Sequence, residues 1–182
     1  MQGPRITPLP PDERDEEIST LLAAVAVGDG ELNIFATLAR HPKLLKNFMR
    51  FGGALLFAGE LSPRDRELLI LRTGANTRSE YEWGQHVRIG REAGLTDEEI
   101  RRAYEGPDAG GWTDLERALL QAADELHASA RISDDTWAVL RERYDDRQLI
   151  ELCMLVGQYH LVAFTLNSLG VEGEPGLEGF PS

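Results

Sequence analysis

Helix-start signals recur at short intervals along this chain, and they constrain its fold more than any other feature. Ser62 precedes Pro63, which pairs an N-cap hydroxyl with a proline in the first helical turn. Thr96 and Thr113 are each followed three residues later by glutamate, the capping-box pattern. Apolar residues between these signals recur at helical spacing, and no segment alternates as a strand would. The sequence therefore predicts an all-α fold.

The same signals predict where each helix lies. Gly74 is expected to end one helix and to open a connector over residues 74–77, and Gly28 to open a break over residues 28–30. The first five expected helices cover residues 15–27, 32–40, 42–58, 63–73 and 79–93. Three more are expected to start at residue 97, at residue 113 (running to 128) and at residue 133. The last runs from residue 145 or 146 to 169.

The 182 residues suit one compact domain. Prolines crowd residues 1–14, which predicts an extended arm that could lie across a neighbouring subunit. Residues 15–171 form the predicted helical domain, and residues 172–182 form an irregular tail rich in glycine and proline. A cap–helix–helix unit from residue 132 onward echoes the one from residue 61, which predicts two internally related helical units.

Composition narrows the partners and the compartment. The net charge of -12 argues against nucleic acid or an anionic membrane as partner. We find neither a signal peptide nor an apolar run approaching a membrane span, so we expect a cytoplasmic protein. The lone cysteine, Cys153, is expected to be a buried small hydrophobe, and Trp112 and Trp137 to be packing anchors.

Residues 79–86 carry the most informative side chains. With Glu67 twelve residues before Ser79, they have the spacing of a helical thiol-redox motif, Cys-x-x-Cys-x-x-x-His with an upstream glutamate. Both cysteine positions hold oxygen-bearing residues instead, namely Ser79 and Glu82. A dithiol–disulfide cycle needs thiols, so the carboxylates and the imidazole that remain point to proton transfer.

Helical spacing places Ser79, Glu82 and His86 on one face, at i, i+3 and i+7. Glu82 lies one turn before His86 and could orient the imidazole, as could Glu67 if the preceding helix folds back against this face. Two neighbouring carboxylates would raise the pKa of one of them and keep it protonated near neutrality. Such a pocket would hold an acid and a base together.

Simpler interpretations stand beside this one. A glutamate and a histidine at i, i+4 are more commonly a solvated surface pair, Glu67 could be surface charge, and Ser79 could be only an N-cap. A metal site built from Glu67, Glu82 and His86 is chemically possible, but no second ligand motif supports it and we expect none.

These residues resemble the carboxymuconolactone decarboxylase family, whose superfamily includes alkyl hydroperoxidase D. The resemblance rests on Glu67, on the Ser79, Glu82 and His86 spacing, and on residues 81–87 and 93–100. It extends from about residue 33 to 171 and is sharpest from 61 to 100. It implies an alkyl hydroperoxidase D-like helical bundle that assembles as a homo-oligomer, with a trimer favoured.

The resemblance also implies roles for individual residues. Glu67 and His86 fall on the proton-relay positions of the alkyl hydroperoxidase D-like members, whereas Ser79 and Glu82 replace their peroxide-reducing cysteines. The decarboxylase branch therefore implies a cofactor-independent lyase that acts on a small unsaturated, carboxylated or lactone-bearing substrate, with Glu67, Glu82 and His86 as catalytic residues. Two alternatives remain: an antioxidant peroxidase using Cys153 or an external thiol, and a non-catalytic small-molecule-binding oligomer.

Further residues are candidates for binding the substrate. Arg72 would bind a substrate carboxylate if its side chain faces inward, and Tyr81 and Trp83 would wall the pocket. Tyr159 and His160 lie on an apolar helix and are either core residues or pocket-lining groups. The candidate substrate-binding residues are Arg72, Ser79, Tyr81, Trp83, Tyr159 and His160.

Overall fold

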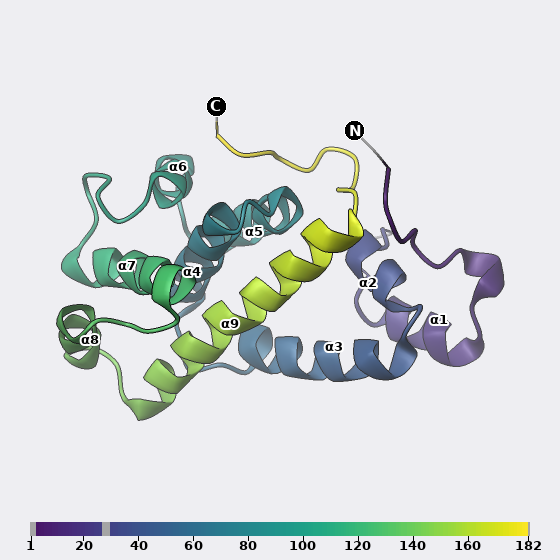
Figure 1. Cartoon of the computed structure of the whole chain (residues 1–182), viewed down its shortest axis with the longest axis horizontal. Coiled ribbons are helices and arrows are strands. Elements are labelled where there is room, and N and C mark those ends of the chain that lie inside the picture. Colours follow the sequence, from purple (N-terminus) through teal and green to yellow (C-terminus); the bar gives the residue numbers. More distant parts are fainter. Residues whose placement is uncertain (1–2, 27–29, 182) are drawn as a thin grey trace.

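The computed structural model describes residues 3–26 and 30–181, and the regular elements of these residues are all helical (Figure 1). The predicted all-α class is confirmed. The elements in chain order are η1 (Pro11–Glu13), α1 (Glu16–Ala23), α2 (Asn33–Leu38), α3 (Pro42–Phe57), α4 (Pro63–Asn76), α5 (Glu80–Glu92), α6 (Asp97–Glu105), α7 (Asp114–Ser129), α8 (Asp134–Arg141) and α9 (Asp146–Leu169).

The predicted helix starts are confirmed at the level of individual hydrogen bonds. Ser62 Oγ accepts a hydrogen bond from the backbone N–H of Asp65 at 3.1 Å and caps α4. Thr96 and Thr113 each form a complete capping box with the glutamate three residues later. Gly170, in the left-handed region at φ 65°, ends α9 as expected.

Gly74 does not end α4, so the expected connector over residues 74–77 is wrong. The helix continues to Asn76, and the chain turns at Arg78, which has a left-handed φ of 53°. A Cβ on Gly74 would lie 3.4 Å from Glu82 Oε1 and 3.5 Å from the Trp83 nitrogen. The glycine is therefore used for the close approach of α5 to α4 rather than for a helix stop.

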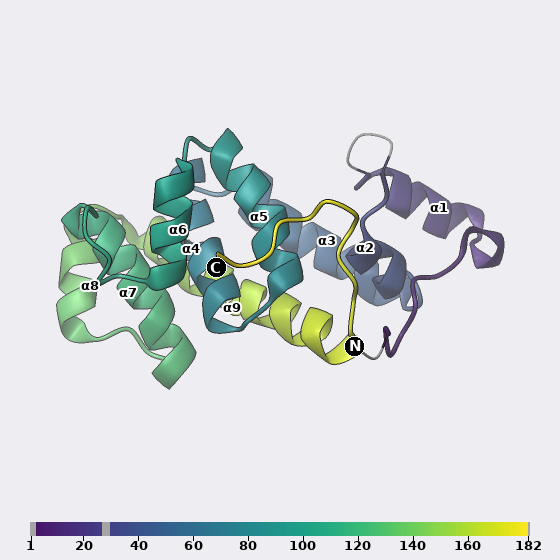
Figure 2. The ribbon, with the colours of Figure 1, turned by 90° about the horizontal axis from the view of Figure 1, so that it is seen from above.

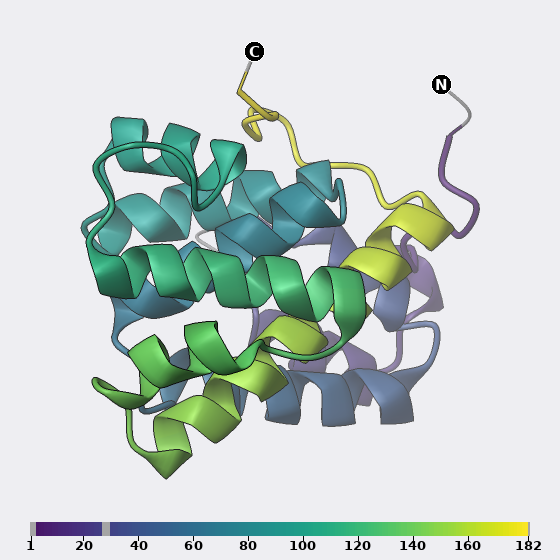
Figure 3. The same cartoon turned by 60° about the vertical axis from the view of Figure 1, so that its left-hand side comes forward.

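Helix α4 lies at the centre of the molecule and packs against α5, α6, α7 and α9. Its residues 68–71 are almost fully buried and divide between two apolar clusters. Leu69 and Ile70 join the cluster shared with α7, α8 and α9, and Figure 3 shows α7 and α8 side by side on that part of the molecule. Leu68 and Leu71 join the cluster shared with α5 and α6. The helix that carries the candidate motif is thus fixed against the most buried helix.

The N-terminal arm lies on its own chain as far as it is described. The Arg5 N–H donates to the Leu169 carbonyl at 2.8 Å, and Leu9 is buried in a separate small cluster with α1, α2 and the start of α3. Helix α1 ends at Ala23, short of the predicted Val27, because the chain leaves helical geometry after Ala24. Val27, like the first two residues of the predicted break at 28–30, falls outside the described residues.

Helix α9 corrects one expectation about membranes. Its length of 24 residues and a window of mean hydropathy 1.6 make it able to cross a membrane by length and composition alone. Half of that window is buried inside the protein, as in the core helix of a soluble fold. Its outward side carries an apolar stripe made of Ile150, Met154, Leu161 and Phe164, whose exposed fractions run from 48% to 65%.

The two tryptophans predicted as anchors behave differently. Trp112 is buried, and its indole N–H donates to the Gly106 carbonyl. Trp137 is 40% exposed, so its prediction as an anchor is wrong. Helix α8 turns Thr136 and Leu140 inward, which leaves Trp137 on the outer side.

The tail after α9 runs along the outer face of α5, as Figures 1 and 2 show from two directions. The Glu174 carboxylate accepts hydrogen bonds from the Tyr81 hydroxyl at 2.7 Å, from Gln85 Nε2 at 2.5 Å and from the Asn33 N–H at 2.7 Å. A Cβ on Gly84 would lie only 2.5 Å from Leu177 Cγ and 2.6 Å from the Glu178 carbonyl oxygen. The middle of α5 is therefore shaped for the tail.

Candidate active site

A buried carboxylate–imidazole pair joins α4 to α5. Glu67 has no exposed surface, and its Oε2 lies 2.6 Å from Nδ1 of His86. Its other oxygen, Oε1, accepts a hydrogen bond from Arg66 Nε at 2.9 Å. Arg66 is itself anchored by a bond to the Leu56 carbonyl at 2.8 Å. Both oxygens of Glu67 are thus occupied, and the imidazole is held in one orientation.

The charges around Glu67 decide its protonation state. Burial alone would raise the pKa of this carboxyl, but His86 and Arg66 together outweigh burial and lower the pKa below its usual value. The ionised carboxylate can only accept, so Nδ1 of His86 carries the proton that is shared with it. Nε2 is then the imidazole nitrogen left for chemistry.

Glu82 is the opposite case, one turn before His86 on the same helix. Its side chain is 2% exposed, and neither carboxyl oxygen has a hydrogen-bond partner within the described residues. Burial raises the pKa of the Glu82 carboxyl well above its usual value, which favours the neutral acid over the carboxylate. The cause is loss of water rather than the expected repulsion by Glu67. The expected partnership of Glu82 with His86 is not formed, because Glu67 orients the imidazole.

Ser79 stands at the N-cap position of α5 but does not cap it with its side chain. The residue has no exposed surface, and its Oγ lacks a hydrogen-bond partner within the described part of the chain. Ser79 therefore occupies the N-cap position, as the simpler interpretation expected, but its side chain does not form the capping hydrogen bond. Its hydroxyl lies three residues before Glu82, on the same side of the helix.

Helix α9 supplies Tyr159 to this group. The tyrosine and imidazole rings of Tyr159 and His86 meet edge to face, with ring centres 4.9 Å apart and planes at 89°. Burial first, then the negative charges of Glu67 and Glu82, raise the pKa of Tyr159 well above its usual value. Tyr159 thus stays protonated and lies within electrostatic reach of both carboxyls.

Four other predicted residues are engaged elsewhere. Arg72 is bound by Asp124, through Nε at 2.5 Å and Nη2 at 2.9 Å, and by the Tyr104 carbonyl. Its positive charge is therefore already balanced. Trp83 packs in the apolar cluster of α5 and α6, whereas Tyr81 binds Glu174 and His160 pairs with His127 at 3.0 Å.

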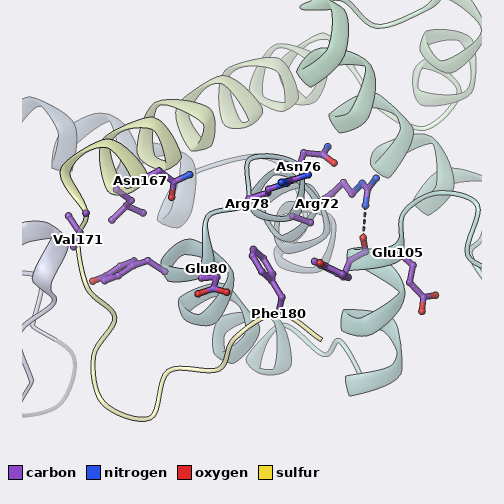
Figure 4. Close-up of a pocket in the computed structure, with 13 residues that line it drawn as sticks. Arg72, Asn76, Arg78, Glu80, Glu105, Asn167, Val171 and Phe180 are labelled. Carbon is purple, nitrogen blue, oxygen red and sulfur yellow. Dashed lines mark hydrogen bonds between the residues drawn. The ribbon is translucent and has the colours of Figure 1, made fainter. Parts of the chain in front are cut away.

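A surface depression of about 920 Å³ lies close by but is a separate feature (Figure 4). Phe180 projects from the tail into it, among side chains that include Arg72, Arg78 and Glu80. None of Glu67, Glu82 and His86 lines this depression. The buried group is almost closed, since the His86 side chain retains 8% of its surface.

The structure offers little for a metal or for thiol chemistry at this place. Within residues 3–26 and 30–181, no cluster of three or more histidine, cysteine or acidic side chains is arranged to hold a metal ion. Cys153, the single cysteine of the chain, is partly buried on α9 and packs against the first apolar cluster. Burial raises the pKa of its thiol, which reduces the thiolate needed for attack on peroxide.

Arg66 is the site residue that sequence reasoning missed. It belongs to the run Arg64-Asp65-Arg66-Glu67, whose alternating charges are typical of an exposed helix surface. The signal that could have found it is its position next to Glu67, because a buried carboxylate needs a charged or hydrogen-bonding partner.

Comparisons with known proteins place this geometry in a family. The model of the carboxymuconolactone decarboxylase family matches residues 42–125, a span that includes Glu67, Ser79, Glu82 and His86. No curated protein matches the chain.

Several solved structures share the fold. An alkylhydroperoxidase AhpD core, an uncharacterized peroxidase-related protein from Ralstonia eutropha JMP134, has a TM-score of 0.82 at 21% identity and covers 94% of each chain. An uncharacterized peroxidase-related protein from Silicibacter sp. TM1040 has a TM-score of 0.77 at 17% identity, covering 99% of this chain and 94% of its own. A variant of the debrominase Bmp8 in complex with 2,3,4-tribromopyrrole has a TM-score of 0.75 at 14% identity, and the match covers 93% of this chain and 91% of the debrominase chain.

At these identities the structural likeness shows the fold alone, whereas the family match covers the helices that carry the site. The resemblance found in the sequence is confirmed. Residues 42–125 of this chain match the model of the carboxymuconolactone decarboxylase family, and the chain has an alkyl hydroperoxidase D-like all-α fold in which Ser79 and Glu82 stand at the positions that the resemblance gives to the paired cysteines.

Proposed function

We propose that this protein is a cofactor-independent lyase of the decarboxylase type, acting by acid–base chemistry on a small unsaturated substrate with a carboxylate or lactone group. One observation carries the proposal. The ionised Glu67 binds His86, while Glu82 on the same face of α5 is buried, neutral and without a partner. Titratable groups driven to opposite protonation states in one place are the arrangement that acid–base enzymes use.

The proposed reaction balances with these groups alone. The bond between the substrate carbon and its carboxylate breaks, carbon dioxide leaves, and the electron pair moves into the conjugated carbonyl. Nε2 of protonated His86 then delivers a proton to that carbon, and the solvent replaces it. Glu67 stabilises the imidazolium before the transfer and holds the ring in place after it, because its carboxylate lies 2.6 Å from Nδ1.

Two observations support acid–base chemistry over the antioxidant alternative. The positions of a peroxide-reducing cysteine pair hold Ser79 and Glu82, and the thiol of Cys153 has a raised pKa. The debrominase with a bound tribromopyrrole supports the idea that this fold accommodates small cyclic molecules. A non-catalytic binding protein would need no proton relay, so the Glu67–His86 pair favours an enzyme.

We also propose that the enzyme is a cytoplasmic homo-oligomer, with a trimer favoured and no nucleic-acid or membrane partner. The apolar stripe of Ile150, Met154, Leu161 and Phe164 on α9, and Phe57 with 87% of its surface exposed, support a subunit interface. The net charge of -12 supports the exclusion of nucleic acid. Sedimentation analysis of the protein, with Phe164→Glu as the variant, measures the assembly directly.

Carbon dioxide release and proton uptake test the proposed reaction. The purified protein is assayed against a panel of carboxylated γ-lactones and vinylogous acids, with His86→Ala as the catalytic variant and His127→Ala as the matched control outside the site. We expect turnover that His86→Ala abolishes and His127→Ala and Cys153→Ser retain. Turnover that survives in His86→Ala would overturn the assignment, and loss in Cys153→Ser would favour thiol chemistry.

A further inference from the structure

Two polar side chains on the inner face of α5 have no hydrogen-bond partner within the described residues. They are Ser79, with no exposed surface, and Glu82, with 2%. Buried polar groups in native proteins are almost always satisfied, and an exception calls for a specific cause. Thr37, Arg102, Tyr144 and Gln158 also have a buried polar atom without a partner in the described chain, but each lies on a different part of it. Ser79 and Glu82 lie on the same side of one helix, three residues apart, so a single partner could serve both.

This protein does satisfy buried carboxylates where their role is structural. Glu151 on α9 is 8% exposed, and it accepts hydrogen bonds from the backbone N–H groups of Glu60 at 2.5 Å and Leu61 at 3.2 Å. Glu67 has both of its oxygens occupied by Arg66 and His86. Glu82 differs from both because the protein provides it with nothing to bind. A water molecule or a ligand from outside the chain would have to supply its partner.

The chemistry of the two side chains defines what that group is. A neutral carboxyl and a hydroxyl can each donate one hydrogen bond, and neither brings a charge. They lie in the first turn of α5, whose N–H groups are not capped by the Ser79 side chain and give that end a partial positive charge. Donors and a helix N-terminus at one place suit an oxygen that carries or gains negative charge.

Of the arginines at positions 66, 72 and 78, the first two are already used and Arg78 lines the neighbouring depression. Arg66 binds Glu67, and Arg72 binds Asp124. A ligand carboxylate placed between Ser79 and Glu82 would therefore meet only neutral hydrogen-bond donors, without a guanidinium group to balance its charge. A carbonyl oxygen that becomes negative only during reaction suits neutral donors better, because they cost less to leave unbound before the charge develops.

We propose that Ser79 and Glu82 form a two-donor site for an enolate or phenolate oxygen of a planar, conjugated small molecule. The site rests on the proposed function, since Nε2 of His86 lies one turn further along α5 and would serve the carbon adjacent to that oxygen. In this site Glu82 is a hydrogen-bond donor that stays protonated, and His86 carries out the proton transfer.

Titration with 4-nitrophenol tests the site without any turnover, because binding shifts the visible absorbance of the nitrophenolate. We expect saturable binding to the full chain. Glu82→Gln keeps a donor and should bind within about threefold of the natural protein, whereas Glu82→Ala should weaken binding by about tenfold and Ser79→Ala by about fivefold. Circular dichroism on each variant confirms the fold, and the conservative Glu82→Gln keeps the test decisive if Glu82→Ala unfolds.

Matched controls separate this site from the neighbouring depression. Arg78→Ala alters the depression and leaves the buried group intact, so it should bind 4-nitrophenol as the natural protein does. Loss of binding in Arg78→Ala with unchanged binding in Glu82→Ala would overturn the proposal, as would the absence of saturable binding to the natural protein.

His86→Ala distinguishes this inference from the proposed function. It should lose turnover and keep 4-nitrophenol binding within about threefold, because the two donors remain. Binding that depends on Ser79 and Glu82 without turnover on any substrate would support the site and count against the lyase. Turnover that depends on His86, with 4-nitrophenol binding indifferent to Ser79 and Glu82, would overturn the site and leave the lyase standing.

Discussion

The polar side chains on the two faces of α5 differ in whether they have hydrogen-bond partners. On the outer face, the Tyr81 hydroxyl and the Gln85 amide both bind Glu174, and Arg91 pairs with Asp97 and Glu178. On the inner face, Ser79 and Glu82 have no partner within the described chain. The outer face is the more exposed of the two, since 41% of the Arg91 side chain is exposed whereas Ser79 and Glu82 are almost fully buried. The comparison teaches that hydrogen-bond satisfaction separates the face that holds the tail from the face that carries the proposed site.

Two glutamates make the contrast concrete. Glu174 accepts three hydrogen bonds from α5 and the start of α2, and so fixes the tail. Glu82 accepts none and is kept neutral by burial. The first stabilises the fold by its contacts, whereas the burial of the second without a partner costs free energy of folding.

The largest expected effect separates the faces by activity. His86→Ala on the inner face should lower kcat/KM by about 10²–10⁴-fold, the usual contribution of a general acid or base. Gln85→Ala on the outer face should leave kcat/KM within about twofold, because only a contact with the tail is lost. Steady-state rates of carbon dioxide release measure both. Equal losses in the two variants would show that the faces do not differ in function.

The second prediction concerns the fit of the tail. Gly84→Ala places a Cβ 2.5 Å from Leu177 Cγ and should lower the free energy of unfolding by about 1–3 kcal/mol, since the tail must move. Gly157→Ala is the matched control in α9, where nothing lies within 4 Å of a new Cβ. That change should raise the free energy of unfolding by up to about 1 kcal/mol through helix propensity. Urea denaturation reports both, and a neutral Gly84→Ala would mean that the tail is not docked.

The third prediction uses pH to test the protonation state of Glu82. Its pKa is raised in the folded protein above 4.5, so the protonated form favours folding and this contribution is complete below pH 4.5. It is lost as pH rises from 4.5 through the folded pKa. Glu82→Gln cannot ionise and should gain stability relative to the natural protein by up to about 1.4 kcal/mol per pH unit in that window. Denaturation at several pH values measures the difference, and a constant difference would exclude a neutral Glu82.

The smallest effect compares two serines at helix starts. Ser62→Ala removes a cap from α4 and should cost about 1 kcal/mol of unfolding free energy. Ser79→Ala removes a hydroxyl without a partner, and its effect should stay within about 0.5 kcal/mol. Thermal denaturation of the two variants ranks them. A larger cost at Ser79 would reveal a structural bond for its hydroxyl.

Much of the helical fold could be predicted from the sequence because its signals are local. A cap such as Ser62 acts on a backbone N–H three residues away, so the sequence contains both partners side by side. The prediction at Gly74 was wrong because a glycine can either end a helix or permit close packing. Which of the two it does here depends on the approach of α5, which the local sequence does not show. The prediction at Trp137 was wrong because the side of α8 that faces inward depends on the helices it packs against.

The site was predictable only in part for the same reason. The spacing that placed Ser79, Glu82 and His86 on one face of α5 is a property of a single helix. The partner of Arg72 is Asp124, which lies 52 residues away on α7, and no local pattern indicates that pairing. Arg66 was hidden in a run of alternating charges whose burial depends on the surrounding helices.

The docking of the tail on α5 has a consequence for the order of folding during synthesis. Residues 174–178 are made about eighty residues after α5, so α4 and α5 can pack against each other before the tail covers the outer face. Until then Tyr81 and Gln85 are hydrated and Gly84 faces water. The nascent chain therefore passes through a form in which the contact between α4 and α5 is made and the face of α5 that binds the tail is still open.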